Sequence, residues 1–414
     1  MAESATVPGG APPGSAEPDA PVAACQGLVT AAEVERALGQ TVRAALDLGL
    51  WDEGGGVESL LTRLPRAVTA AVREEGRLRT AIRGRVLRAL PDFPDAPPGA
   101  GVYRAADRFL QSARRNVLLN GALTAVQGAC AGHDSLAATL VSVGVCLARY
   151  DGAMCSWRTT FLRHDYDCRH GESVDELRSL LDRRAERGVA GAGVAVGRDR
   201  ITGLLRRGFM AAAERKALRD RAGSPWRMGH GVPAPLELLT GSGCMELIDE
   251  SLPLLEDLLL RDSHWVFLPD ALGSRALTTL ADALEPGEFA IVQKGKPALE
   301  AMVECGTYAV GYKRRVQAFA SRLGESSVLG GFRATRYAPA RLFVAHAERA
   351  AEAAVIALAD ASLQPHRGHP LLLDLAALGA QSGLGVEAFR GVIESAYARA
   401  GATGLLADAP PAHP

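Results

Sequence analysis

Carboxylates that follow or precede apolar segments are the residues of this chain best suited to chemistry. Asp270 ends an apolar run in "HWVFLPDALGS" (264–274), and Glu250 and Glu256 lie in the apolar-striped stretch "CMELIDESLPLLEDLLL" (244–260) before it. Two or more carboxylates around Mg²⁺ or Mn²⁺ let the metal activate water and neutralise charge on a leaving oxygen. The pattern therefore indicates metal-assisted hydrolysis.

The end of the first predicted strand carries an uncharged residue where a carboxylate would be expected. In "TAVQGACAGHDSLAATLVSVGVCLARYDG" (124–152) the first apolar strand runs into Gln127 and Gly128. A glutamine carbonyl can touch a metal but brings no charge, so the electrostatic stabilisation that an aspartate would give is missing. Asp134, on the turn into the second strand, either supplies that charge or is a turn residue. Glu214, in "GFMAAAERKAL", is either an alternative helix acid or an exposed helix glutamate.

A separate set of ligand-type residues stands in "CSWRTTFLRHDYDCRH". Cys155, His164, Cys168 and His170 are of the types that bind zinc, but their spacing matches no standard finger. A polar surface hairpin or loop is the favoured interpretation of this stretch. The nearby Asp165 and Asp167 would equally suit a harder cation.

The elements that must position these residues are mixed strands and helices. Strands are predicted at 123–126, 138–148, 264–269, in "EFAIVQKGK", in "TYAVGYKRR" and in "RYAPARLFVAH". Helices are predicted around 103–117, over much of 172–220, at 244–260 and in the last 65 residues. The expected fold is α/β with a mixed sheet, in which the strands ending at Val126, Pro269 and Val310 share one sheet.

The N-terminal region is predicted to contain a tail and helices, without strands. Residues 1–23 are rich in Pro, Gly, Ala and acids and are expected to be a disordered tail. Thr30 and Glu33 form a predicted capping box that begins a helical region. Residues 24–100 are predicted to be helical and to end in the linker "PDFPDAPPGAG" (91–101), with a nuclease-like domain over 101–400 and a tail at 401–414. The arginine run between Arg77 and Arg88 is interpreted as a solvated helix face in preference to a DNA or partner surface.

The composition limits the classes of protein to which this chain can belong. The 414 residues are 48% hydrophobic with a net charge of −1, so any polyanion site must be a local patch. Seven irregularly spaced cysteines predict no disulfide framework and favour reduced thiols in a cytoplasm. No signal peptide or membrane span is predicted. A P-loop, a dinucleotide fingerprint and a G-x-S-x-G elbow are absent, which leaves no case for the enzymes that depend on them.

The order of the motifs resembles that of the NurA family of DNA-end-processing nucleases, which act with HerA-type hexameric ATPases. Gln127 and Gly128 occupy the place of that family's first Asp-Gly. Asp270 stands at the end of a later strand, where the family has a second Asp-Gly. The "YAVGYKRR" stretch is similar to the family's Gly-x-x-Lys strand. In "RGHPLLLDLAALGAQ", His369 stands where the family has Tyr and Ala377 where it has His.

This resemblance implies an RNase H-like mixed sheet flanked by helices, with a helical N-terminal extension. It implies a Mn²⁺ or Mg²⁺ site from Asp270, Glu256, Asp134 and Gln127, with Glu250 and His369 as further catalytic candidates. DNA would be contacted by positively charged side chains at Lys313, Arg314, Arg315, Arg336 and Arg341. The implied partners are DNA, a HerA-type ATPase and a second copy of the chain in a homodimer.

Two possible functions follow from the resemblance, and a third interpretation applies if the resemblance is accidental. The first is a metal-dependent DNA nuclease in DNA repair or phage defence, driven by a separate translocase. The second is a catalytically inactive relative that binds DNA or docks on the ATPase, because Gln127 replaces a charged ligand. The third is an unrelated globular scaffold in which the motif order arose by chance.

Overall fold

The structure is a computed structural model and describes residues 30–51, 57–134, 139–163, 175, 178, 200–270, 275–384 and 386–401. The predicted tails, His164 to His170, and Ala271 with Leu272 lie outside these residues. The chain divides into two compact units, Met1–Ala70 and Ala71–Pro414. No helix among the described residues is long and apolar enough to cross a membrane.

The first unit contains short helices. They are α1 (Ala31–Leu38), α2 (Val42–Ala45), the 3-10 turn η1 (Leu48–Leu50) and the start of α3 (Val57–Arg85). The capping box is confirmed: Thr30 Oγ1 accepts from the Glu33 amide, and the Glu33 carboxylate accepts from the Thr30 amide at 2.8 Å. Gly39, with φ 69°, ends α1 in the left-handed conformation that glycine adopts readily.

The second unit is built on one mixed sheet, which confirms the predicted α/β class. Its described strands are β1 (Gly101–Arg104), β2 (Leu123–Asp134), β3 (Thr139–Ala148), β4 (Met154–Arg163), β5 (Trp226–His230), β6 (Trp265–Leu268), β7 (Glu288–Lys294), β8 (Ser327–Arg333) and β9 (Arg341–His346). Their order is β1-β7-β8-β9-β6-β5-β2-β3-β4. β5 is parallel to β2 and β6, and the other pairs are antiparallel.

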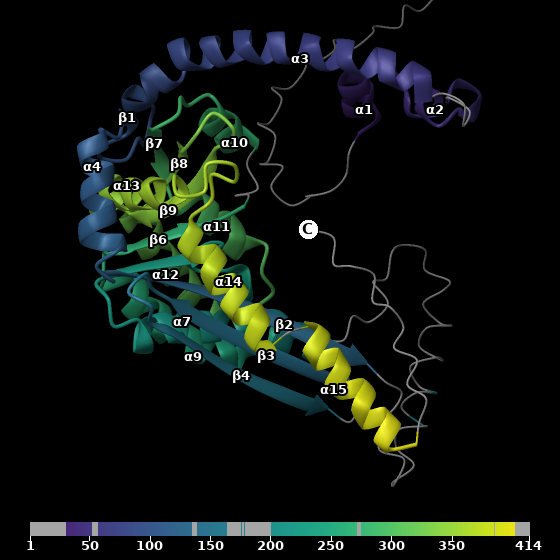
Figure 1. The fold of residues 1–414 in the computed structure, drawn as a ribbon, viewed down its shortest axis with the longest axis vertical. Helices are drawn as coiled ribbons and strands as arrows, with labels where there is room; N and C mark the ends of the chain where they lie inside the picture. Colours follow the sequence, from purple (N-terminus) through teal and green to yellow (C-terminus); the bar gives the residue numbers. More distant parts are fainter. Residues whose placement is uncertain are drawn as a thin grey trace, which may run out of the picture. The chain divides into compact units, whose positions relative to one another are not determined.

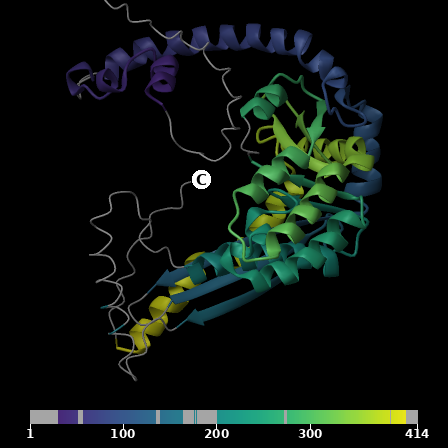
Figure 2. The same ribbon diagram turned by 180° about the vertical axis from the view of Figure 1, so that it is seen from behind.

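Helices cover both faces of this sheet (Figures 1 and 2). The described helices of this unit are α4 (Asp107–Ala113), α6 (Arg200–Gly203), α7 (Met210–Arg221), α8 (Leu236–Leu239), α9 (Met245–Leu255), α10 (Arg275–Asp282), α11 (Lys296–Glu304), α12 (Tyr312–Ser326), α13 (Ala350–Ala361), α14 (Leu371–Leu384) and α15 (Val386–Arg399). Short 3-10 or π segments are η2 (Leu87–Asp92), η3 (Arg114–Leu118), η4 (Leu204–Phe209), η5 (Gly241–Gly243), η6 (Glu256–Leu260) and η7 (Ala347–Arg349).

Two apolar clusters form the layers. One packs α13 and α14 against β2, β5 and β6 through residues such as Leu123, Met228 and Leu372. The other packs α7, α9 and α12 on the opposite face through residues such as Val126, Leu218 and Phe267. Because side chains alternate along a strand, neighbouring residues of β2 and β5 face different helical layers.

Two sequence predictions need correction. No strand ends at Val310, which is fully exposed; Gly311 has φ 88° and α12 begins at Tyr312. The stretch "YKRR" has no apolar alternation to hold it in a sheet and instead begins a helix. The strand predicted at 123–126 runs on to Asp134 in β2, so Gln127 lies within this strand and not at its end.

Candidate functional site

Two parallel strands, β5 and β6, end beside Gln127 of the longer parallel strand β2, and polar residues gather at this level of the sheet. In the β2–β5 ladder Val126 pairs with Gly229, and in the β5–β6 ladder His230 pairs with Leu268. Gln127, His230 and Asp270 therefore follow one another across the point where β5 and β6 end. We call Gln127, Glu214, His230, Asp270 and His369 the strand-end cluster.

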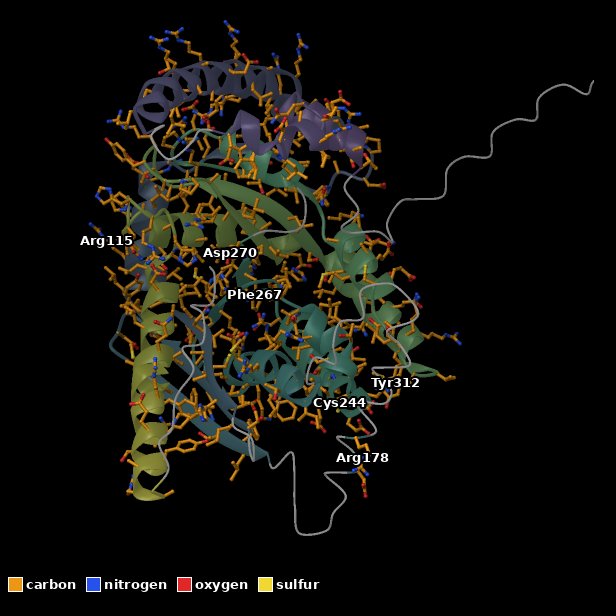
Figure 3. The ribbon with its side chains drawn as sticks, turned by 90° about the vertical axis from the view of Figure 1, so that its right-hand side faces the viewer. Arg115, Arg178, Cys244, Phe267, Asp270 and Tyr312 are labelled. Carbon is orange, nitrogen blue, oxygen red and sulfur yellow. The ribbon has the colours of Figure 1, made fainter. Side chains whose placement is uncertain are left out.

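Asp270 lies where the sequence predicted it, just past a strand end (Figure 3). Its Oδ2 is 3.1 Å from Nε2 of His230, a residue that sequence reasoning missed. The Asp270 side chain is 72% exposed and that of His230 33%. The carboxylate can therefore hold the imidazole in one orientation while both remain accessible.

His369 extends the cluster from the loop before α14. Its ring centroid is 6.4 Å from that of His230, and its Nδ1 is 3.3 Å from Oδ1 of Asp374. Burial lowers the pKa of His369, and Asp374 opposes that shift. Arg367 is paired with Asp374 at 3.0 Å, and Arg341 donates to the carbonyl of Arg367. Of the predicted DNA-contacting residues, Arg341 is thus joined to this edge.

Glu214 approaches the same level of the sheet from α7, on the face opposite to that of Gln127. The β2–β5 ladder ends at Val126 and Gly229, so the next β2 amide on that side, that of Gly128, has no strand partner. Glu214 Oε1 accepts from this amide at 2.6 Å. A Cβ at position 128 would stand 2.8 Å from the same oxygen, so glycine is needed for this approach.

The buried Glu214 is neutralised within the fold. Arg215 Nη1 is 3.1 Å from Glu214 Oε2, and Arg215 also donates to the carbonyls of Val232 and Pro233 after β5. Burial raises the pKa of Glu214, against the opposing effects of Arg215, the Gly128 amide and His230. The Arg215 guanidinium lies 4.6 Å over the Phe267 ring. Through its bonds to Glu214 and to the two carbonyls, Arg215 connects α7 to the loop that follows His230.

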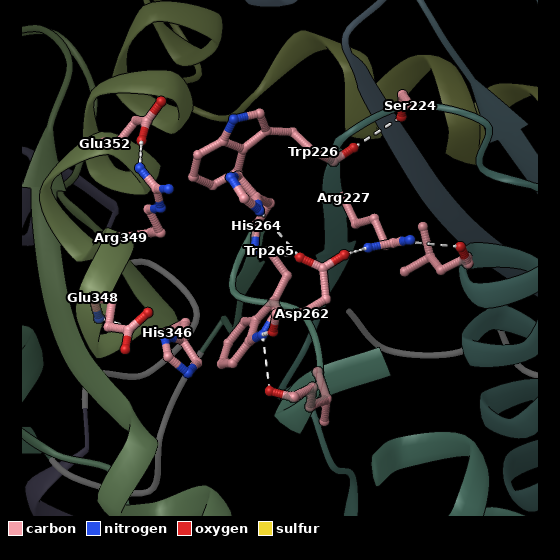
Figure 4. Close-up of polar contacts among 12 residues, drawn as sticks. Ser224, Trp226, Arg227, Asp262, His264, Trp265, His346, Glu348, Arg349 and Glu352 are labelled. Atoms are coloured by element: carbon pink, nitrogen blue, oxygen red, sulfur yellow. Dashed lines mark hydrogen bonds and ion pairs between the residues drawn. The ribbon is translucent and has the colours of Figure 1, made fainter. Parts of the chain in front are cut away.

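The opposite ends of β5 and β6 are held by a second polar network (Figure 4). Asp262 accepts from the Arg227 guanidinium of β5 and, at 2.9 Å, from the amide of His264 before β6. Trp265 donates its indole N–H to the carbonyl of Asp262 at 3.0 Å. These bonds fix the register of the two parallel strands, and with it the level at which His230 and Asp270 meet.

Gln127 and Asp134 are not close together. Both belong to β2, and a rise of about 3.3 Å per residue places their backbones roughly 23 Å apart. Asp134 therefore cannot share an ion with Gln127. By strand alternation Gln127 lies on the same face as Leu123 and Ala125, the face covered by α14.

The predicted helix acids lie elsewhere. Glu256 accepts from Arg322 of α12 at 2.8 Å, and Glu250 lines a groove beside α7 and β4. Within the part of the chain that the structure describes, neither of them forms a hydrogen bond or ion pair with Asp270.

The remaining predicted DNA-contacting residues are dispersed. Lys313 is paired with Glu304 and Arg315 with Asp249, Arg314 is exposed, and Arg336 stacks on Tyr337. Of the zinc-type residues, Cys155 is an exposed residue of β4.

The residues present do not fit the predicted Mn²⁺ or Mg²⁺ centre. No group of three His, Cys, Asp or Glu side chains within the described ranges is placed to hold a metal ion. Glu214 is engaged by Arg215 and an amide, Gln127 is uncharged, and Asp270 is the one freely accessible carboxylate of the cluster. Hard divalent cations in proteins prefer several oxygen ligands with negative charge. What the cluster offers instead is imidazole, amide and guanidinium groups.

Two solved structures of NurA nucleases match this chain. The NurA nuclease from Sulfolobus solfataricus matches with a TM-score of 0.42 and 10% identity over 82% of this chain and 98% of that chain. A structure of NurA with manganese matches with a TM-score of 0.36 and 11% identity over 81% of this chain and 98% of that chain. No family model and no curated protein matches the sequence. With TM-scores below 0.5, these similarities assign no residue role to this chain.

Proposed function

We propose that this chain is a NurA-like DNA-binding subunit whose strand-end cluster contacts phosphate groups and does not form a carboxylate metal centre. An RNase H-like nuclease takes its acids from a strand end, a helix and a second strand end. We infer that Gln127 of β2, Glu214 of α7 and His230 of β5 correspond to those three acids here. The strand order β4-β3-β2-β5-β6, with β5 and β6 parallel to β2, supports this assignment.

The observation that carries the proposal is the state of Glu214. Its carboxylate is bonded to the Gly128 amide and to the buried Arg215, so its charge is compensated before any ligand arrives. Gln127 carries an amide N–H donor and His230 an imidazole, and Arg341 and Arg367 lie beside His369. Such donors favour an anion, and phosphate contacts by Arg and His position a nucleic acid without reading its sequence.

DNA binding and DNA cleavage are tested together. We expect fluorescence anisotropy to detect binding of end-labelled oligonucleotides, with an affinity that falls as salt rises. Arg341→Gln should lower the slope of log affinity against log salt by about one, because one phosphate contact is lost. Arg115→Gln, at an exposed residue of η3, is the matched control and should leave the slope unchanged. With Mn²⁺ or Mg²⁺ present, the bound DNA should remain intact.

The metal-dependent nuclease predicted from the sequence is a second proposal. Asp270 is the observation in its favour, because its carboxylate is exposed at a strand end and 3.1 Å from an imidazole. Cleavage that requires Mn²⁺ and is abolished by Asp270→Ala would establish this second function and overturn the first.

A partner role accompanies either function. We propose that the chain acts in the cytoplasm, forms a homodimer and docks on a HerA-type ATPase in DNA repair or phage defence, as the family resemblance implies. Co-purification with such an ATPase, and the mass of the isolated chain in solution, are the direct tests. A monomer that retains no ATPase would exclude this role.

A further inference from the structure

A groove of about 570 Å³ lies apart from the strand-end cluster, between the β3–β4 flank of the sheet and helices α7 and α9. Its floor is apolar and includes Val143 and Val145 of β3. Neither His230 nor Asp270 lines it. The volume falls within the range of pockets that hold small organic ligands.

Aromatic side chains line one wall of this groove. Trp157, Thr159 and Phe161 alternate along β4 and therefore share one face of the strand. Phe161 meets Phe209 edge to face, with ring centroids 5.6 Å apart. Trp157 is 42% exposed although its neighbours in the groove are largely apolar. An accessible indole in such a setting offers a flat surface on which a planar ring can stack.

Cationic groups gather at the opposite wall. Three basic residues of α7, Lys216, Arg219 and Arg221, line this wall together with Asp220 of the same helix. Glu250 of α9 and Arg158 of β4 complete the charged lining. Lys216 and Arg219 both pair with Asp220, at 3.3 and 2.6 Å, and Arg219 also lies 3.8 Å from Asp257. Arg221, the exposed last residue of α7, makes no ion pair within the described part of the chain. The positive charge of Arg221 therefore lies in the same groove as the stacking surface.

We propose that this groove binds a planar aromatic ring that carries a phosphate, namely a nucleotide. The ring stacks on Trp157 and the phosphate is held by Arg221 and its basic neighbours. Aromatic stacking combined with positive charge is how proteins bind the bases and backbone of single nucleotides and strands. The nucleotide is either a free molecule or the terminal residue of a nucleic acid strand, because both present the same ring and phosphate.

Calorimetric titration of the full chain with adenosine 5′-monophosphate, adenosine, inorganic phosphate and a 5′-phosphorylated trinucleotide tests the groove. We expect the nucleotide to bind more tightly than adenosine or phosphate alone. Trp157→Ala should weaken binding by about tenfold or more through lost stacking, and Arg221→Glu should do so through charge reversal. Arg115→Glu changes an exposed arginine that does not line the groove (Figure 3). It is the control and should bind the nucleotide as wild type does.

A conservative variant separates stacking from folding. Trp157→Phe keeps an aromatic face, so it should bind the nucleotide while losing the fluorescence quenching that Trp157 contributes. Trp226 and Trp265 are buried, and the exposed Trp51 does not line the groove, so its signal should not change. Binding of the trinucleotide with none of the monophosphate would assign the groove to strand ends. No binding of either molecule, or equal binding by wild type, Trp157→Ala and Arg221→Glu, would overturn the proposal. These outcomes do not depend on metal binding or DNA cleavage at the strand-end cluster.

Discussion

Glu214 Oε1 accepts a hydrogen bond from the amide of Gly128, with 2.6 Å between the two atoms. The bond forms where the β2–β5 ladder ends, so a helix side chain completes the hydrogen bonding of a strand. The second oxygen of the same carboxylate faces Arg215, which is itself buried. We interpret Glu214 as a structural clamp of the strand-end cluster and not as a free metal ligand.

Removing this carboxylate should destabilise the protein strongly. Glu214→Ala leaves the guanidinium of Arg215 buried without its partner, which costs about 3–5 kcal/mol in comparable pairs. Urea unfolding followed by circular dichroism measures the loss. Glu394→Gln, which removes half of an exposed pair with Arg390 on α15, is the control and should cost less than about 0.5 kcal/mol. A Glu214→Ala protein as stable as wild type would show that the carboxylate is not a clamp.

A second buried carboxylate should make stability depend on pH. Burial raises the pKa of Asp360 to about 6, against the hydrogen bonds from Tyr150 and from the Leu372 amide. The folded state therefore holds a proton that the unfolded state releases near its ordinary pKa of 3.8. The contribution of Asp360 to stability is full below that value and is lost as pH rises through about 6, a change of roughly 3 kcal/mol.

Thermal unfolding between pH 4 and pH 7 checks this dependence. Asp360→Asn should remove the fall in stability over that window, because the side chain no longer titrates. Tyr150→Phe removes a hydrogen bond that lowers the Asp360 pKa, so the fall should move to higher pH. An unchanged profile in both variants would contradict the assignment.

Glu288 should stabilise the packing of α3 on the sheet. It accepts from Arg83 at 2.7 Å, from Arg104 at 3.1 Å and from the Glu285 amide at 2.8 Å. Its side chain is 8% exposed, whereas those of Arg83 and Arg104 are 33% and 62% exposed. Glu288→Gln should therefore cost about 2 kcal/mol in urea unfolding, below the range for fully buried pairs. Arg104→Ala should cost less than about 1 kcal/mol. Equal losses in both variants would argue against a buried carboxylate as the centre of this contact.

The sequence predicts the strands that are apolar along their whole length. β3, β6, β7 and β9 lie where Val, Leu, Ile and Phe form short runs, and such runs are typical of buried strands. β5 was missed because "WRMGH" contains an arginine and a glycine. Arg227 of β5 is stabilised by Asp262, in the segment before β6, and by the carbonyl of Leu218 in α7, contacts between elements that no local pattern reveals.

The candidate site is harder to predict for the same reason. Asp270 was found because it ends an apolar run, whereas His230 ends a strand that was not recognised. Glu214 was considered, but its exposure was the expectation, since a glutamate beside an arginine on a helix usually faces water. It is buried because the β2–β5 register leaves the Gly128 amide unpaired, and that register is a tertiary property.

Calorimetric titration with Mn²⁺ tests the central claim most directly. Wild type, Asp270→Ala and Gln127→Asp are compared at pH 7 in low salt. We expect wild type to bind Mn²⁺ with a dissociation constant of about 1 mM or weaker and Asp270→Ala to behave identically, because one free carboxylate does not make a site. Gln127→Asp should bind more tightly than wild type, since it adds a charged ligand to the strand-end cluster. A wild type that binds one Mn²⁺ at micromolar concentration, and loses it in Asp270→Ala, would contradict the account.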